Sequence, residues 1–163
     1  LCKNQLLDIV NTFPNLKISL AHLGLPHLVI PSLEETYDEI AKYPNIYMDT
    51  AMIPSKDVLT MSLSAFGSKR IMFGSDEPIN LIKSNVYQNP KLGERIITEY
   101  IYHWVDKEEH EQYKKLAVGA THMHWPAIQA IKDSIENLYA PEKQSEVKND
   151  IFSINATRFF KFA

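Results

Sequence analysis

Residues 70–78 read RIMFGSDEP, in which a short apolar strand over 70–75 ends at Asp76. Two earlier segments also have the composition of strands, LKISLAH at 16–22 and IYMDTA at 46–51. Helical periodicity precedes each strand, over residues 4–13, 33–41 and 56–66. Because helices and strands alternate with short links, the sequence predicts an α/β fold with parallel strands joined by right-handed crossovers.

Local signals mark the helices of this first part. Ser32 and Glu35 have the spacing of a capping box at the start of the second helix. Ser55 is a candidate N-cap of the third helix, and Gly67 is a candidate C-terminal stop. The positions expected to face the core repeat at helical spacing, Leu33, Tyr37, Ile40 and Ala41 in the second helix and Val58, Leu59, Ser62, Leu63 and Phe66 in the third.

The alternation ends near residue 80, and the rest of the chain has helical patterns. The helices predicted there cover residues 92–103, 107–117, 126–138, 141–154 and 156–161. The charged run at 107–111 is typical of a solvated helix face, and we expect His110 within it to lie at the surface. The sequence therefore predicts two parts, residues 1–80 with the three strands and residues 81–163 as a helical C-terminal extension that packs on them.

Composition limits the functions available to the chain. Its 163 residues are 45% hydrophobic and 23% charged, which suits a globular domain. The net charge of −3 argues against nucleic acid as a partner, and no apolar run approaches the roughly 20 residues of a membrane span. Cys2 is the only cysteine, which excludes an intrachain disulfide and fits a cytoplasmic protein. Because the chain begins at Leu1 within an apolar helical pattern, we expect it to be a piece of a longer protein.

Two predicted strands end in side chains that can do chemistry. His22 closes the strand at 16–22, and Asp76 follows the strand at 70–75. Functional groups of parallel α/β folds lie at the carboxyl ends of strands, where a carboxylate can bind a divalent metal and an imidazole can ligate it or hold water. The alternatives are a carboxylate that only caps the next turn and a packed structural histidine. Asp49 lies inside its strand and is a weaker candidate.

Four fragments in this order, LKISLAHLG, IYMDTA, RIMFGSDEP and INATRFF, resemble the carboxyl-terminal half of the amidohydrolase superfamily. The resemblance is to its amidohydrolase-2 group, which is similar to aminocarboxymuconate semialdehyde decarboxylase. It implies the last three strands of a (β/α)8 TIM barrel, a fold that takes roughly 250 residues when complete. In that family Asp76 corresponds to a metal ligand and general base. His22 corresponds to a sixth-strand histidine that contacts the metal-bound water or the substrate.

The resemblance also implies a function. We expect part of a metal-dependent hydrolase that uses a divalent ion, zinc or a similar metal, and acts on a small carbonyl or carboxylate compound through metal-activated water. The alternatives are a metal-dependent decarboxylase of the same fold and a catalytically incomplete half-barrel with a role in assembly. The other metal ligands of the family lie upstream of these strands. The expected partners are therefore a small-molecule substrate and either the missing N-terminal half or further copies of the chain.

A second histidine pair, His122 and His124 in THMHW, has the spacing of a metal-binding His-x-His. It lies between two predicted helices, directly before Pro126. We interpret it as a polar and aromatic helix connection, with a ligand role as the alternative.

Overall fold

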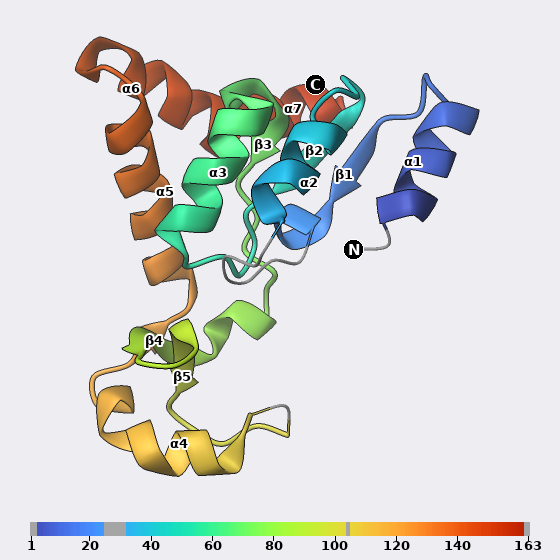
Figure 1. Ribbon diagram of the computed structural model, residues 1–163. Coiled ribbons are helices and arrows are strands. Elements are labelled where there is room, and N and C mark those ends of the chain that lie inside the picture. Colours follow the sequence, from blue (N-terminus) through green and yellow to red (C-terminus); the bar gives the residue numbers. More distant parts are fainter. Residues whose placement is uncertain (1–2, 25–31, 104, 162–163) are drawn as a thin grey trace.

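The computed structural model describes residues 3–24, 32–103 and 105–161. The first part of the chain forms a parallel sheet in the order β1-β2-β3, with Ile18 opposite Ile46 and Met48 opposite Ile71 (Figure 1). Its strands are shorter than predicted, β1 Ile18–Leu20, β2 Ile46–Asp49 and β3 Ile71–Met72. The prediction of parallel strands separated by helices is confirmed.

The three helices of this part lie where the sequence predicts them, α1 Lys3–Thr12, α2 Leu33–Ile40 and α3 Lys56–Phe66. Ser55 caps α3 by accepting a hydrogen bond from the Val58 amide, and Gly67 ends that helix with a φ of 70°. The predicted capping box at Ser32 is wrong, because a left-handed backbone at this residue, with φ of 65°, accompanies a side chain that makes no capping bond.

The C-terminal helices belong to the same hydrophobic core as the parallel sheet. They are α5 His124–Leu138, α6 Pro141–Asn149, the π-helical segment η5 Asp150–Ile154 and α7 Asn155–Phe160. Ile131, Ile135 and Ile151 are almost fully buried in the cluster that also contains core residues of α2 and α3. The Phe73 amide donates to the Ile151 carbonyl (2.8 Å), so the C-terminal region also binds the backbone just after β3.

Residues 82–122 form a separate lobe that leaves the carboxyl end of β3 (Figure 1). Its sheet is antiparallel in the order β5-β4-β6, and a short helix and a 3-10 turn pack beside it. The bounds are β4 Lys83–Asn89, β5 Gly93–Thr98, α4 Lys107–Tyr113, η4 Lys114–Ala117 and β6 Thr121–His122.

The predicted helix at 92–103 is therefore wrong, and so is an all-helical extension over this lobe. Asn89 makes the turn, since its Oδ1 accepts hydrogen bonds from the Lys91 and Leu92 amides (2.9 and 3.1 Å). Gly93 continues the turn with a φ of 77°, a conformation that suits glycine. The strand after it contains the β-branched Ile96 and Ile97, whose apolar side chains fit a sheet as well as a helix.

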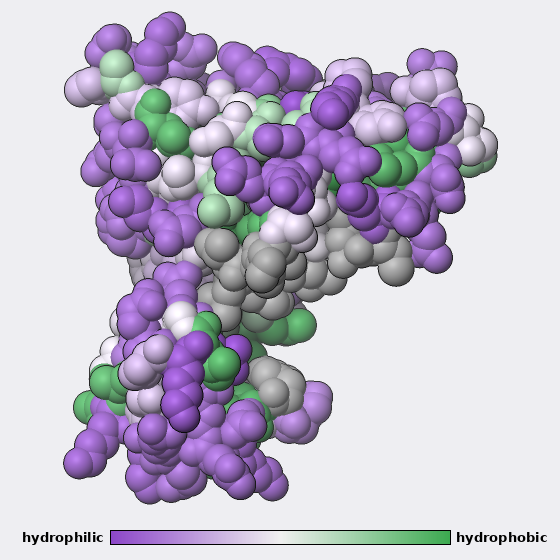
Figure 2. All heavy atoms as spheres, in the orientation of Figure 1, coloured by the Kyte–Doolittle hydropathy of each residue, from purple (hydrophilic) through white to green (hydrophobic). Residues whose placement is uncertain are grey.

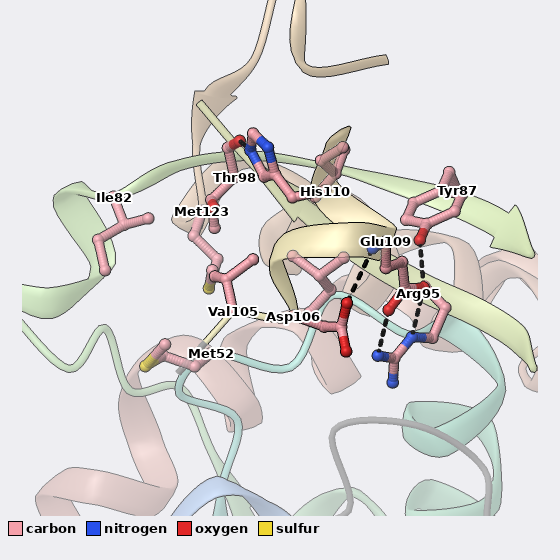
Figure 3. A pocket seen from close by; sticks show the side chains of 12 residues that line it. Met52, Ile82, Tyr87, Arg95, Thr98, Val105, Asp106, Glu109, His110 and Met123 are labelled. Carbon is pink, nitrogen blue, oxygen red and sulfur yellow. Dashed lines mark hydrogen bonds and ion pairs between the residues drawn. The ribbon is translucent and has the colours of Figure 1, made fainter. Parts of the chain in front are cut away.

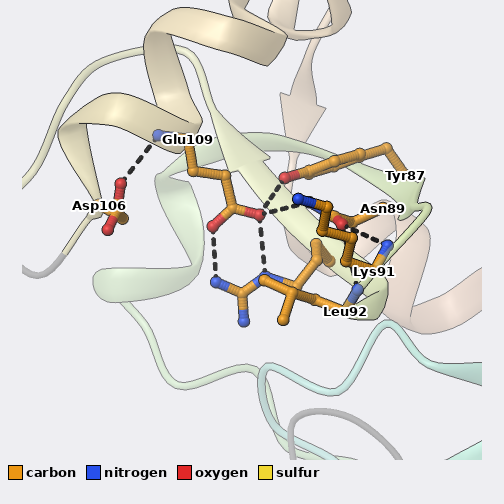
Figure 4. A network of polar contacts seen from close by, with 7 residues as sticks. Tyr87, Asn89, Lys91, Leu92, Asp106 and Glu109 are labelled. Carbon is orange, nitrogen blue, oxygen red and sulfur yellow. Dashed lines mark hydrogen bonds and ion pairs between the residues drawn. The ribbon is translucent and has the colours of Figure 1, made fainter.

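The charged run at 107–111 is not a fully solvated face. Glu109 points toward the β4–β5 hairpin, where Arg95 binds its carboxylate through Nε (3.1 Å) and Nη2 (2.8 Å). Tyr87 and Asn89 donate to the same carboxylate (Figure 4). The side chain of His110 is buried, and its Nε2 donates to the Thr98 carbonyl (2.9 Å), so the prediction of a surface histidine is also wrong.

The surface in Figure 2 is mostly hydrophilic over both the upper body and the lower lobe, with small separate hydrophobic areas. Among the described residues, no helix has the length and hydrophobicity to cross a bilayer. Both observations agree with the net charge of −3 and the moderate hydrophobic content of the chain.

Shortening Ile131 to alanine tests whether α5 belongs to the main core. This fully buried side chain lies in the cluster shared with α3, so we expect Ile131→Ala to lower the free energy of unfolding by about 2–5 kcal/mol in urea denaturation. Leu138→Ala on the same helix is the matched control, because Leu138 is 37% exposed. Equal losses in the two variants would contradict the assignment of α5 to the core.

The Glu109 network predicts a dependence of stability on pH. Hydrogen bonds from Arg95 and Tyr87 lower the pKa of Glu109 from its usual 4.5 to about 2. Because the folded pKa lies below the unfolded one, this stabilisation is complete above about pH 5 and is lost as the pH falls toward about 2. We expect urea denaturation at several pH values to show a smaller acid-induced loss for Glu109→Gln than for the unmodified protein. Glu108→Gln, at an exposed neighbouring position, is expected to leave that loss unchanged.

Candidate active site

The structure brings the two predicted site residues together at one edge of the parallel sheet. His22 lies in the turn η1 Ala21–Gly24 directly after β1, and Asp76 follows β3 by four residues. His22 Nε2 and Asp76 Oδ2 are 4.0 Å apart, and their side chains are 21% and 32% exposed. Both line a pocket of about 270 Å³ that opens at the carboxyl ends of the three strands. Their chemical roles stay predictions.

Left-handed backbone conformations follow all three strands. The φ angles are 55° at His22, 56° at Met52 and 57° at Asp76, and none of these residues is glycine. Side chains with a Cβ rarely adopt this region, and it costs energy that the surrounding structure has to offset. Such conformations cluster at functional sites, where they aim a side chain in a direction that an ordinary turn does not allow.

Asp49, at the end of β2, holds the turn that carries the histidine. Its Oδ1 accepts hydrogen bonds from the backbone amides of His22 (3.0 Å) and Ala51 (3.1 Å). Gly74 lies so close that an added Cβ would stand 3.4 Å from this oxygen and from the Cβ atoms of Asp49 and Ala51. Asp49 therefore acts on the backbone of both strand ends, and Gly74 leaves room for its carboxylate.

The imidazole of His22 is oriented by the turn that follows β2. Its Nδ1 lies 3.1 Å from the carbonyl oxygen of Ala51, which can only accept, so Nδ1 carries a proton. In the neutral ring this leaves the lone pair on Nε2, the nitrogen that faces Asp76. Nε2 of His22 and Oδ2 of Asp76 thus face each other across 4.0 Å in the pocket. A proton or a cation placed there would be stabilised by both.

The described residues do not form a complete metal centre. They contain no group of three or more His, Cys, Asp and Glu side chains that could hold an ion. His22 and Asp76 offer two donors, whereas a catalytic zinc ion takes three protein ligands. Asp49 has one oxygen committed to two backbone amides.

The pair His122 and His124 lies away from this pocket. His122 is the last residue of β6, and its Nδ1 donates to the Leu81 carbonyl (2.7 Å). The ring of His124, at the start of α5, stacks on it with a centroid distance of 5.8 Å. The motif connects a strand to a helix, not two helices as predicted, and neither ring lines the pocket of His22 and Asp76. A ligand role for this pair is untested.

A protein-family model described as Amidohydrolase matches residues 5–162, which is nearly the whole chain. The chain belongs to the amidohydrolase family. The resemblance predicted from the four sequence fragments is therefore confirmed. No curated protein sequence is significantly similar to the chain.

Solved structures support the fold of this amidohydrolase chain. An amidohydrolase from Burkholderia multivorans with bound zinc matches with a TM-score of 0.55 at 14% identity, over 99% of this chain and 50% of that one. A second structure with that description, with bound HEPES, matches with a TM-score of 0.58 at 14% identity, over 99% and 51%. 5-Carboxyvanillate decarboxylase from Sphingomonas paucimobilis matches more weakly, with a TM-score of 0.46 at 18% identity over 95% and 36%. The chain thus spans about half the length of the first two proteins.

Sequence reasoning ranked Asp49 below the other two residues and did not identify its role. Asp49 lies within an apolar strand, where a carboxylate that faces inward is unusual. This unusual position is the sequence signal that could have identified Asp49 as a functional residue. The predicted C-terminal segment NATRFF also reaches the site, since Ala156 and Phe160 line the pocket.

Removing the carboxylate of Asp49 tests its action on the turn. In Asp49→Ala the amides of His22 and Ala51 lose their acceptor, so we expect the free energy of unfolding to fall by about 1–3 kcal/mol and the imidazole signals of His22 to move in NMR spectra. Asp49→Asn keeps an acceptor oxygen and is expected to lose less. Asp38→Ala, at an exposed position of α2, controls for loss of a carboxylate. An unchanged His22 spectrum in Asp49→Ala would refute the positioning role.

Proposed function

We propose that this amidohydrolase chain is the C-terminal part of a metal-dependent hydrolase that acts on a small carbonyl or carboxylate compound. His22 and Asp76 are the groups assigned to the reaction. The observation that carries the proposal is the 4.0 Å approach of His22 Nε2 to Asp76 Oδ2 in an open pocket at the strand ends. Membership of the amidohydrolase family supports the reaction class.

The proposed architecture is the last three strands of a (β/α)8 barrel. The parallel order β1-β2-β3 and the intervening helices have the pattern of consecutive barrel units. Within the described residues β1 and β3 each pair with one strand only, which leaves both outer edges for neighbouring strands. Amidohydrolase structures about twice as long match the same fold over nearly all of this chain. The edges are where the rest of the barrel, or another copy, would pair.

The proposed roles follow from the geometry of the two side chains. Asp76 accepts a proton from the attacking water and returns it to the leaving group, as carboxylates do in general acid–base catalysis. Its carboxylate is partly exposed in the pocket, so water can reach it. His22 presents Nε2 to the same point and holds water or substrate there, with its orientation fixed by the Ala51 carbonyl. We further propose that Asp76 is one ligand of a divalent metal, with the remaining ligands outside the described residues.

Decarboxylation is the second candidate, because a proton held between the same two side chains could also be delivered to carbon after loss of carbon dioxide. A non-catalytic role in assembly is the third, and the lack of a three-ligand cluster among the described residues is what favours it. The catalytic proposals require Asp76 for turnover, whereas the assembly proposal does not.

The substitution Asp76→Asn in the complete protein distinguishes these proposals. It removes the proton-accepting charge with little change in shape, so we expect turnover to fall by about 10²–10⁴-fold. Glu77→Gln is the matched control, because Glu77 is the adjacent carboxylate and is exposed. Elemental analysis of both variants reports the metal content. Full turnover with full metal content in Asp76→Asn would remove the catalytic role.

A further inference from the structure

A second cavity of about 290 Å³ lies between the 82–122 lobe and the loop that follows β2 (Figure 3). It shares no lining residue with the pocket of His22 and Asp76. Small-molecule sites usually have this form, an apolar hollow with a few polar groups that orient the ligand. The apolar side of the cavity is formed mainly by Met52, Ile82, Ile97, Val105 and Met123.

The charged groups that line the cavity do not cancel. Arg95 is bound by both oxygens of Glu109, so these two charges compensate each other. Asp106 has no such partner, since it forms no ion pair within residues 3–24, 32–103 and 105–161. Its Oδ1 accepts a hydrogen bond from the Glu109 amide (2.8 Å) as the N-cap of α4, and its side chain lines the cavity (Figure 3). The formal charges of Arg95, Glu109 and Asp106 in the lining therefore sum to −1, and the partly solvent-exposed Asp106 supplies the negative charge next to an apolar wall.

We propose that this cavity binds a small primary amine with an aromatic or branched apolar body. The ammonium group of the ligand pairs with Asp106, and its apolar body lies against Met52, Val105 and Met123. Because Arg95 is already paired with Glu109, an anionic ligand would find no unpaired arginine in this cavity. An amine therefore fits the cavity better than a carboxylate does. The inference rests on the lining of this cavity and does not depend on the proposed reaction of His22 and Asp76.

Three probes of similar shape test the proposal, 2-phenylethylamine, 2-phenylethanol and 3-phenylpropanoate. Titration of the intact protein labelled with ¹³C at the methionine methyl groups reports binding at Met52 and Met123, with Met48 and Met61 as reporters outside the cavity. The variants Met52→Leu and Met123→Leu assign the two signals. We expect the amine to shift both signals, to bind more tightly than the alcohol, and to bind more tightly than the carboxylate.

Two variants test the two halves of the cavity. Asp106→Asn keeps an N-cap acceptor but removes the charge, so we expect the Kd of the amine to rise about threefold and that of the alcohol to stay unchanged. Asp57→Asn, an exposed residue in the first turn of α3, is the matched control. Val105→Phe fills the hollow and is expected to abolish binding of the amine, whereas Val118→Phe, at a position 82% exposed, is not.

Three results would overturn the proposal. They are the lack of any shift at Met52 and Met123 with the amine, a carboxylate that binds as tightly as the amine, and amine binding that Asp106→Asn leaves unchanged. Circular dichroism shows whether Val105→Phe folds. If it does not, the comparison of amine and alcohol in Asp106→Asn decides, because that substitution leaves the apolar wall intact.

Discussion

The geometry of the site depends on one carboxylate that binds the backbone of two strand ends. Asp49 Oδ1 accepts the amides of His22 and Ala51 and so joins the end of β1 to the end of β2. Without that acceptor, the amides of His22 and Ala51 would lose this hydrogen bond in turns that contain the left-handed residues His22 and Met52. The Ala51 carbonyl, in the turn after β2, then fixes the His22 ring. The position of the turn at His22 and the direction of its Nε2 therefore follow from three hydrogen bonds between the ends of β1 and β2.

The third strand is held in a different way, from the far end of the chain. Asn155 Nδ2 donates to the carbonyls of Ser68 (2.6 Å) and Ile71 (2.8 Å), and the Phe73 amide donates to Ile151. Asp150 adds a hydrogen bond from the Ser68 hydroxyl (3.2 Å). Backbone groups around β3 are thus satisfied by the turn between α6 and α7. Residues more than seventy positions away in the sequence therefore help to place Asp76. They can do so because the C-terminal helices pack in the same core as the sheet.

The sequence was sufficient for features that depend on local periodicity. It placed the three parallel strands and their helices, and it selected His22 and Asp76 because both follow apolar strands. Prediction from the sequence failed where the choice between helix and strand depends on long-range contacts. Ile96 and Ile97 fit a helix as well as they fit the hairpin in which they pair with β4. The charged run was misread because Arg95, across the lobe, turns Glu109 inward. The role of Asp49 depends on the φ of His22, for which no sequence pattern exists.

The number of strands limits how many functional side chains the described residues bring to the edge of the parallel sheet. A parallel sheet offers about one inward-facing functional side chain at the end of each strand, and here these are His22, Asp49 and Asp76. Oδ1 of Asp49 is occupied by two backbone amides, whereas His22 Nε2 and Asp76 Oδ2 face each other in the pocket. The chain spans about half the length of the matched amidohydrolase structures, and its three-stranded sheet brings His22 and Asp76 to one edge.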